Sequence, residues 1–251
     1  MSRRLPIALL GWLLTLPAAL PVHAQGPLPS GREVVNKFIE AMGGRQVVLA
    51  QSGRHTTGSF DIPSQGMSGA LDVYAQPPNK MLARVTLQGI GEIVSGFDGT
   101  TAWAVNPMMG PMILDSLQAQ QTRQQADFYA SLYPDDQITS LETVADTTFE
   151  GTRSYQVKVT TAWGESYHEF FDRESGLILG SQRHGATQMG NIEILTMVSD
   201  WRTVEGMRVP FKSVQRTMGI EQVVTITQVE VTTVPDSVFV LPPEIQALMK
   251  E

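Results

Sequence analysis

The sequence predicts an α+β fold that is mostly β: a strongly curved antiparallel sheet, or incomplete barrel, with helices covering its concave open side. Between residues 55 and 231, apolar residues recur at every second position in a series of short runs. Turn sequences such as Asp98-Gly99 separate neighbouring runs, and such short connections indicate antiparallel pairing. An amphipathic helix precedes the runs, and its apolar stripe suits a cover over a sheet that must bury one face.

Residues 1–24 are predicted to be a secretory signal peptide that is removed on export. Arg3 and Arg4 give it a positive start, an apolar run follows from Leu5 to Leu20, and Val22-His23-Ala24 is a small-residue cleavage signal. The apolar run is too short for a membrane-spanning helix, and no second apolar stretch is long enough for one. We therefore expect an exported, periplasmic protein without a membrane span.

The remaining residues, 25–251, are expected to form a single domain. The sequence contains no cysteine, so the domain must be held together by its apolar core rather than by disulfide bonds. The formal net charge of the full sequence is −7, and loss of the two signal-peptide arginines, with no acidic residue, makes it −9. Because an acidic chain repels phosphate backbones, the composition argues against nucleic acid as a partner.

The first predicted helix begins at a capping box, in which Ser30 accepts a backbone hydrogen bond and Glu33 reaches back. Apolar residues at helical spacing follow over residues 34–42, and Gly43-Gly44 ends the helix. A short second helix is expected over residues 45–51.

The predicted strands follow these helices and are interrupted once. The interruption is the glutamine-rich segment 116–130, which predicts a polar surface helix anchored by Leu117 and Phe128. After the last strand, Phe239 is expected to dock the chain, and a short helix follows Pro242-Pro243. The predicted strands cover residues 55–62, 67–75, 80–87, 93–97, 101–105, 140–147, 153–160, 165–172, 177–184, 191–201, 208–218 and 221–231.

Three methionines follow the fifth predicted strand, in a segment where regular structure is not expected. Asn106-Pro107 breaks the strand, and Gly110-Pro111 separates Met108 and Met109 from Met112. Methionine is unbranched and polarisable, so these residues suit either a deformable apolar rim or a loop that fills gaps in the core. The glycine and proline favour the rim.

Four stretches of the sequence resemble the outer-membrane lipoprotein-sorting proteins of the LolA/LolB-like superfamily: "GFDGTTAWAVNPMMGP", "FFDRESGLIL", "SDWRTVEGMRVPF" and "PDSVFVLP". The resemblance covers nearly the whole chain after residue 24 and is closer to the broad periplasmic branch than to the dedicated lipoprotein carrier. It implies an incomplete antiparallel barrel, closed by helices, around an apolar cavity that takes acyl chains. The carrier closes its helical lid with an arginine inside the cavity, and Arg54 and Arg84 are the candidates for that residue here.

The resemblance, together with the positions of the apolar residues, predicts which side chains line the cavity or its mouth. Trp103 and Trp163 are expected in strand-like settings, where they either line the cavity or fill it as core. The predicted ligand-binding residues are Phe38, Met42, Val85, Leu87, Trp103, Val105, Met108, Met109, Met112, Trp163 and Phe171.

Catalytic and metal chemistry have no support in the sequence. There is no cysteine nucleophile and no Gly-x-Ser-x-Gly motif. His168 and Glu169 are adjacent in a predicted strand, so they point to opposite faces and cannot bind one metal ion together.

The sequence therefore predicts a non-enzymatic carrier or chaperone for a lipid or an acylated protein, without cofactor or metal. Two alternatives remain open. One is an envelope protein-interaction or sensing module built on the same scaffold, with a protein partner. The other is a hydrolase, which requires a cluster of polar groups inside the cavity.

Overall fold

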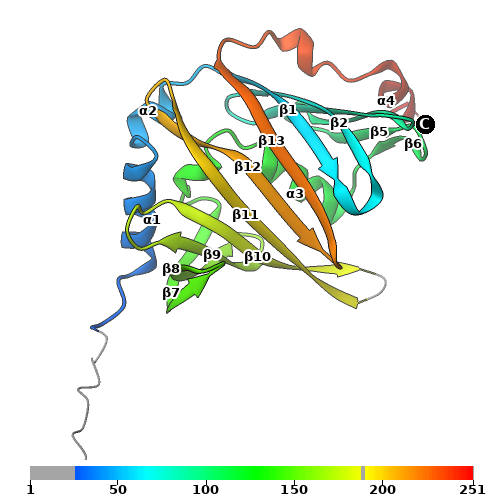
Figure 1. Ribbon diagram of the computed structural model, residues 1–251. Coiled ribbons are helices and arrows are strands. Elements are labelled where there is room, and N and C mark those ends of the chain that lie inside the picture. The colour runs from blue at the N-terminus through cyan, green and yellow to red at the C-terminus, as the bar shows by residue number, and fades with distance from the viewer. Residues whose placement is uncertain (1–25, 188–189, 251) are drawn as a thin grey trace, which may run out of the picture.

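The computed structural model describes residues 26–187 and 190–250, so the predicted signal peptide lies outside the described residues (Figure 1). Among the described residues, no helix has the length and apolarity needed to cross a bilayer. The helices are α1 (Gly31–Ala41), α2 (Arg45–Leu49), α3 (Ser116–Ala126) and α4 (Pro243–Leu248), with short 3₁₀ turns η1 (Pro63–Gln65), η2 (Ala130–Leu132) and η3 (Asp236–Phe239). The strands are β1 (Arg54–Ile62), β2 (Met67–Gln76), β3 (Lys80–Leu87), β4 (Gly91–Phe97), β5 (Ala102–Asn106), β6 (Gly110–Ile113), β7 (Ile138–Phe149), β8 (Thr152–Thr161), β9 (Ser166–Asp172), β10 (Ile178–Thr187), β11 (Gly190–Val204), β12 (Met207–Thr217) and β13 (Ile220–Val231).

The described strands form one 13-stranded antiparallel sheet in the order β6-β5-β4-β3-β2-β1-β13-β12-β11-β10-β9-β8-β7. Two meanders, β1–β6 and β7–β13, are joined where the first strand pairs with the last, with Arg54 opposite Val231. The sheet curls, and β6 and β7 stand at opposite ends of the order (Figure 1). The predicted incomplete barrel is confirmed.

Each predicted strand is present, and β6 is an additional strand that the sequence did not predict. The prediction that residues 106–112 lack regular structure is wrong: β5 and β6 form a hairpin in which Val105 lies opposite Pro111. The Asn106 side chain accepts a hydrogen bond from the Met108 backbone at 2.8 Å, and Gly110 has a φ of +79°. Proline is tolerated here because β6 is an edge strand, where a missing N–H breaks no ladder.

Helix α1 covers the β7–β8 end of the sheet. Its capping box is present, and Val34, Val35 and Phe38 are buried in the largest core cluster. A Cβ atom on Gly31 would overlap the backbone of Leu141 on β7, so the helix lies directly against the strand. The predicted amphipathic cover is therefore confirmed for this helix.

Helix α3 lies inside the curve of the sheet, behind β11 and β12 in Figure 1. It packs on the β3–β5 half through Ala126, which contacts Phe97 and Ala102. The prediction of a polar surface helix is confirmed for Gln118, Gln121 and Gln125, which are exposed. Three of its glutamines, at positions 121, 124 and 125, also line a cavity, which the sequence did not predict. Of its two predicted anchors, Phe128 is buried, and the Leu117 side chain lies outside what the structure describes.

The C-terminal segment covers the outer face of the sheet over strands β2–β6. Phe239 of η3 and Ile245 of α4 are buried against Leu82 and Trp103, so the predicted docking of Phe239 is confirmed. The sheet therefore has helices on both faces: α1 and α3 on the concave side, and α4 on the outer side.

Candidate functional site

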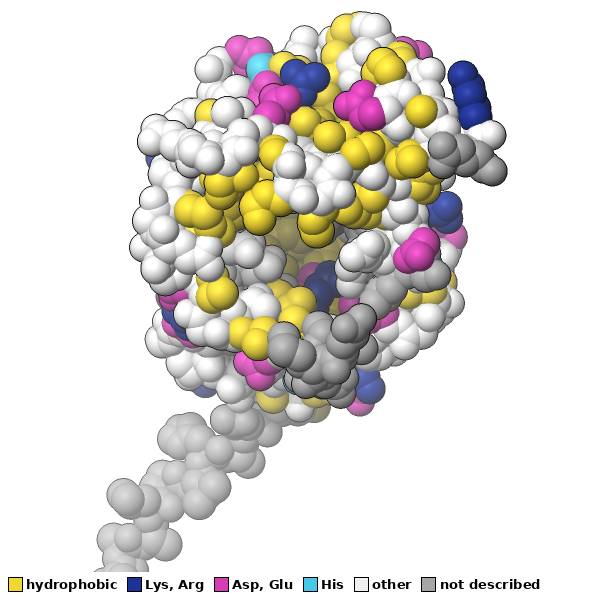
Figure 2. Space-filling view, turned by 90° about the vertical axis from the view of Figure 1, so that its right-hand side faces the viewer, with side chains coloured by type: hydrophobic (Ala, Val, Ile, Leu, Met, Phe, Trp, Pro, Cys, Tyr) yellow, Lys and Arg dark blue, Asp and Glu magenta, His cyan; other side chains and the backbone are white. Residues whose placement is uncertain are grey.

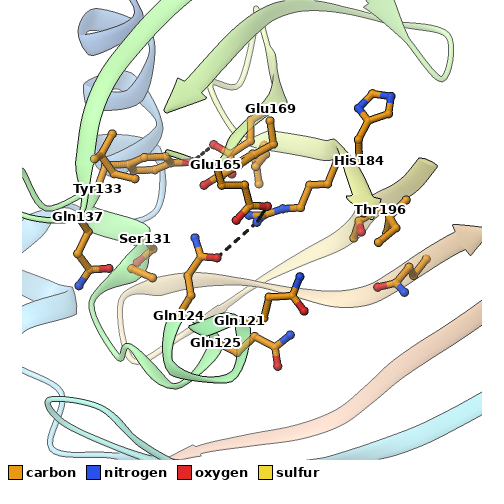
Figure 3. A pocket seen from close by; sticks show the side chains of 18 of the residues that line it. Gln121, Gln124, Gln125, Ser131, Tyr133, Gln137, Glu165, Glu169, His184 and Thr196 are labelled. Carbon is orange, nitrogen blue, oxygen red and sulfur yellow. Dashed lines mark hydrogen bonds and ion pairs between the residues drawn. The ribbon is translucent and has the colours of Figure 1, made fainter. Parts of the chain in front are cut away.

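A cavity of about 590 Å³ lies between α3, the η2 segment and the inner face of β9–β12 (Figure 3). Most of its lining side chains are polar, which differs from the apolar cavity that the family resemblance implied. The lining residues are Phe38, Gln121, Gln124, Gln125, Ala130, Ser131, Tyr133, Pro134, Gln137, Ile138, Glu165, Tyr167, Glu169, Ile178, Arg183, His184, Gly185, Ile194, Thr196 and Gln215.

Strand alternation in β9 places a carboxyl group inside the molecule. Tyr167, Glu169 and Phe171 are all buried and share the inward face, whereas His168 is only partly buried on the other. The prediction that His168 and Glu169 point in opposite directions is confirmed. In the described part of the chain, no three His, Asp or Glu side chains come together as a metal-binding group.

Glu169 is held by one tyrosine. The Tyr133 hydroxyl donates a hydrogen bond of 2.5 Å to Glu169 Oε2 (Figure 3). Burial raises the pKa of Glu169 to about 7, because the loss of hydration outweighs the Tyr133 hydrogen bond and the Arg183 charge, which both lower the pKa. Burial also raises the pKa of Tyr133 well above its usual value, and the neighbouring Glu169 raises it further. The carboxyl is therefore ionised in only part of the molecules at neutral pH.

Arg183 on β10 connects three sides of the cavity. Its guanidinium lies 3.6 Å from the centroid of the Tyr167 ring, and its Nη1 atom is 3.5 Å from Glu165 Oε1. Nη1 also donates a hydrogen bond of 3.4 Å to Gln124 Oε1 on α3 (Figure 3). Burial, with Glu169 nearby, raises the pKa of Tyr167 above its usual value. The arginine thus links α3 to the sheet across the cavity.

Neither arginine that the sequence nominated lies in this cavity. The Arg54 guanidinium lies 4.4 Å from the centroid of the Phe128 ring, and burial lowers its pKa. Arg84 lines a shallow pocket of about 240 Å³ beside α4 on the outer face. Sequence reasoning missed Arg183, because strand alternation alone did not show that β10 would face a polar cavity.

Apolar side chains form a second feature of the concave face, next to the cavity. The strand registers place these apolar side chains on the same face of the sheet as Phe97, which contacts α3. All of them except the buried Leu87 are partly exposed. We call this set the concave apolar stripe: Phe60, Leu71, Val73, Val85, Leu87, Ile93, Val224 and Ile226. The space-filling view shows a hollow with hydrophobic side chains along much of its rim (Figure 2). Of the predicted ligand-binding residues, Val85 and Leu87 belong to this stripe.

The structure places four other predicted residues near the cavity or in the core. Phe38 lines the cavity, with its ring centroid 5.6 Å from that of Phe171, which is fully buried. Met42 is buried in the same core cluster. Trp163 lies in the turn between β8 and β9, so the prediction of a strand-like setting is wrong for this residue. It lines a second pocket of about 310 Å³, which shares Gln124 and Gln137 with the main cavity.

The remaining predicted residues lie in or near the β5–β6 hairpin. Trp103 belongs to the core cluster formed with the C-terminal segment, and Val105 packs against that cluster. Both residues therefore lie on the outer face, on the opposite side of the sheet from the cavity. Met108 and Met109 are 79% and 69% exposed at the tip of the hairpin, and Met112 is partly buried opposite Ala104. The structure therefore does not gather the predicted residues into one site.

No protein-family model and no curated protein matches the sequence. Solved structures share its fold, and three of them illustrate the likeness. A LolA superfamily protein from Nitrosomonas europaea has a TM-score of 0.58 at 12% identity, covering 85% of this chain and 99% of that one. A DUF1329 family protein from Desulfovibrio piger has a TM-score of 0.57 at 8% identity, covering 84% and 98%. A putative outer membrane lipoprotein-sorting protein domain from Vibrio parahaemolyticus has a TM-score of 0.53 at 7% identity, covering 86% and 100%.

The likeness to these structures, at such low identities, concerns the fold. The chain has a LolA-like fold, and the predicted resemblance is confirmed at this level.

Proposed function

We propose that the protein is an exported, periplasmic, non-enzymatic carrier that binds the acyl chain of a lipid or an acylated protein on the concave side of its sheet. The observation that carries this proposal is the concave apolar stripe, whose side chains, except that of Leu87, stay partly exposed inside a hollow half-barrel. Apolar surface of this kind gains free energy when a hydrocarbon chain covers it. The LolA-like fold and the predicted signal peptide agree with such a role.

The hydrophobic effect is large enough for carriage in water. Each buried methylene contributes about 0.8 kcal/mol, so a sixteen-carbon chain contributes on the order of 12 kcal/mol when fully buried. Ordering the chain and immobilising the ligand oppose binding by several kcal/mol, and a favourable balance remains. Met108 and Met109, exposed at the tip of the β5–β6 hairpin, suit an adaptable apolar rim at the entrance.

Two neighbouring valines on β13 provide a matched test. Val224 belongs to the concave apolar stripe, while Val223 pairs with Val214 on the outer face, and both are partly exposed. The assay measures the affinity of palmitate from its displacement of the uncharged fluorescent probe N-phenyl-1-naphthylamine. We expect Val224→Asp to lower this affinity at least about tenfold, because the substitution places a charge beside the hydrocarbon chain. Val223→Asp is expected to change the affinity of palmitate less than about twofold. Equal binding by both variants would remove the stripe as the site.

A second candidate, the protein-interaction or sensing module, is favoured by the exposure of Met108 and Met109 at 79% and 69%. Exposed apolar side chains at a hairpin tip also suit a protein interface. Purification from the periplasm of the native host distinguishes the two functions. A stoichiometric protein partner without lipid supports the module, and co-purifying lipid found by native mass spectrometry supports the carrier.

A further inference from the structure

The charges inside the main cavity are largely compensated by one another. Glu165 and Arg183 lie 3.5 Å apart, and the guanidinium also covers the Tyr167 ring. Glu169 is buried behind the Tyr133 hydroxyl, and its pKa of about 7 leaves it partly protonated at neutral pH. The cavity therefore presents only a weak net charge to a ligand.

A charged ligand group would be poorly accommodated in this environment. A phosphate or carboxylate would lie near the two glutamates, while the one arginine of the lining is already engaged by Glu165, Gln124 and Tyr167. An ammonium group would find the Glu165 carboxylate already paired with Arg183. Either ion would give up hydration that the cavity does not replace.

Uncharged polar groups, in contrast, find many partners. Gln121 and Gln125 project from α3, and Thr196 of β11 lies on the opposite wall (Figure 3). Gln215 of β12 pairs with Thr196 and also lines the cavity. Gln121 and Gln125 are both exposed and line the cavity, so their amides are accessible to a ligand. Each amide can donate and accept at once, which matches hydroxyl groups, since these also do both.

The polar cavity and the concave apolar stripe lie on the same concave face of the sheet. Gln215 of the cavity pairs across β12 and β13 with Gln222, which lies two residues before Val224 of the stripe. A volume of about 590 Å³ is within the range of small-molecule sites. We propose that the cavity binds the uncharged, hydroxyl-bearing head group of an acyl lipid, recognised by the α3 glutamines while the hydrocarbon lies on the stripe. This inference rests on the proposed function and adds the chemical class of the head group.

Ligands with the same hydrocarbon and different head groups test the proposal. We would measure displacement of N-phenyl-1-naphthylamine from the mature chain at pH 7.5 by 1-lauroylglycerol, laurate and dodecylamine. We expect 1-lauroylglycerol to bind at least about tenfold more tightly than laurate or dodecylamine. Its hydroxyl groups can hydrogen-bond to the glutamine amides, and it has no ionic hydration to lose. Binding of all three with equal affinity, or tighter binding of an ion, would overturn this inference and leave the carrier function standing. Displacement by none of them would overturn both.

A double variant identifies the residues responsible. In Gln121→Met/Gln125→Met, unbranched side chains of similar size keep the helix but lose both amides, so the preference for lauroylglycerol over laurate should fall about tenfold. Gln118→Met is the matched control, since Gln118 is exposed on the same helix and does not line the cavity. A loss of preference in the control equal to that in the double variant, or no loss in either, would contradict the assignment.

Discussion

Replacing Glu169 by Gln is expected to change how the stability of the protein depends on pH. The pKa of this carboxyl is about 7 in the folded protein, against an ordinary value of 4.5, because the group is buried. Between pH 4.5 and 7 the folded state therefore binds more protons than the unfolded state. The free energy of unfolding falls as pH rises through this window, and it stays lower above pH 7.

The size of this effect follows from the shift in pKa. At 1.36 kcal/mol per pKa unit, moving the carboxyl from 4.5 to about 7 corresponds to about 3 kcal/mol. The side-chain amide of the Glu169→Gln variant would keep an oxygen that accepts the Tyr133 hydrogen bond, but it would not titrate. The variant should therefore gain about 3 kcal/mol relative to the wild-type protein between pH 4.5 and pH 8.

Urea unfolding of both proteins at five pH values from 4.5 to 8.5 measures this difference. Glu40→Gln serves as the control, because Glu40 is exposed on α1, and its unfolding curve should run parallel to that of the wild-type protein. If the Glu169→Gln protein also ran parallel to the wild type, the carboxyl would not be desolvated as its burial implies, and the reasoning would be refuted.

Three further predictions concern other parts of the fold. Tyr133→Phe removes the hydroxyl donor of the buried carboxylate and should cost about 1–3 kcal/mol at pH 8, with a smaller loss at pH 5, in the same urea assay; equal losses at both would contradict it. Gly31→Ala should destabilise by about 1–3 kcal/mol, although alanine favours helices, because its Cβ would overlap the Leu141 backbone; an unchanged thermal midpoint would disprove this contact. Met108→Ser/Met109→Ser should leave the free energy of unfolding within about 0.5 kcal/mol but slow acyl-lipid uptake from vesicles, and unchanged uptake would exclude the rim.

Local patterns predicted most of the elements correctly. The capping box at Ser30 placed the start of α1, and the alternation of apolar residues placed the strands, because these signals depend only on neighbours in the chain. The edge strand β6 was missed because Pro111 usually ends a strand, and an edge position is not visible locally. The glutamines of α3 were predicted as surface residues, and three are exposed, but polarity alone did not show that several of them also line a cavity.

The sequence by itself determined the fold class, the amphipathic cover and the opposite directions of His168 and Glu169, since backbone periodicity fixes which face a side chain occupies. Only the tertiary structure decided what each face meets. Tyr133 reaches Glu169, 36 residues further along, because the chain returns over the concave side after α3. Trp103 is buried on the outer face of the sheet because the C-terminal segment covers it there. Such contacts depend on how a long sheet curls and what covers it, and no local pattern records either.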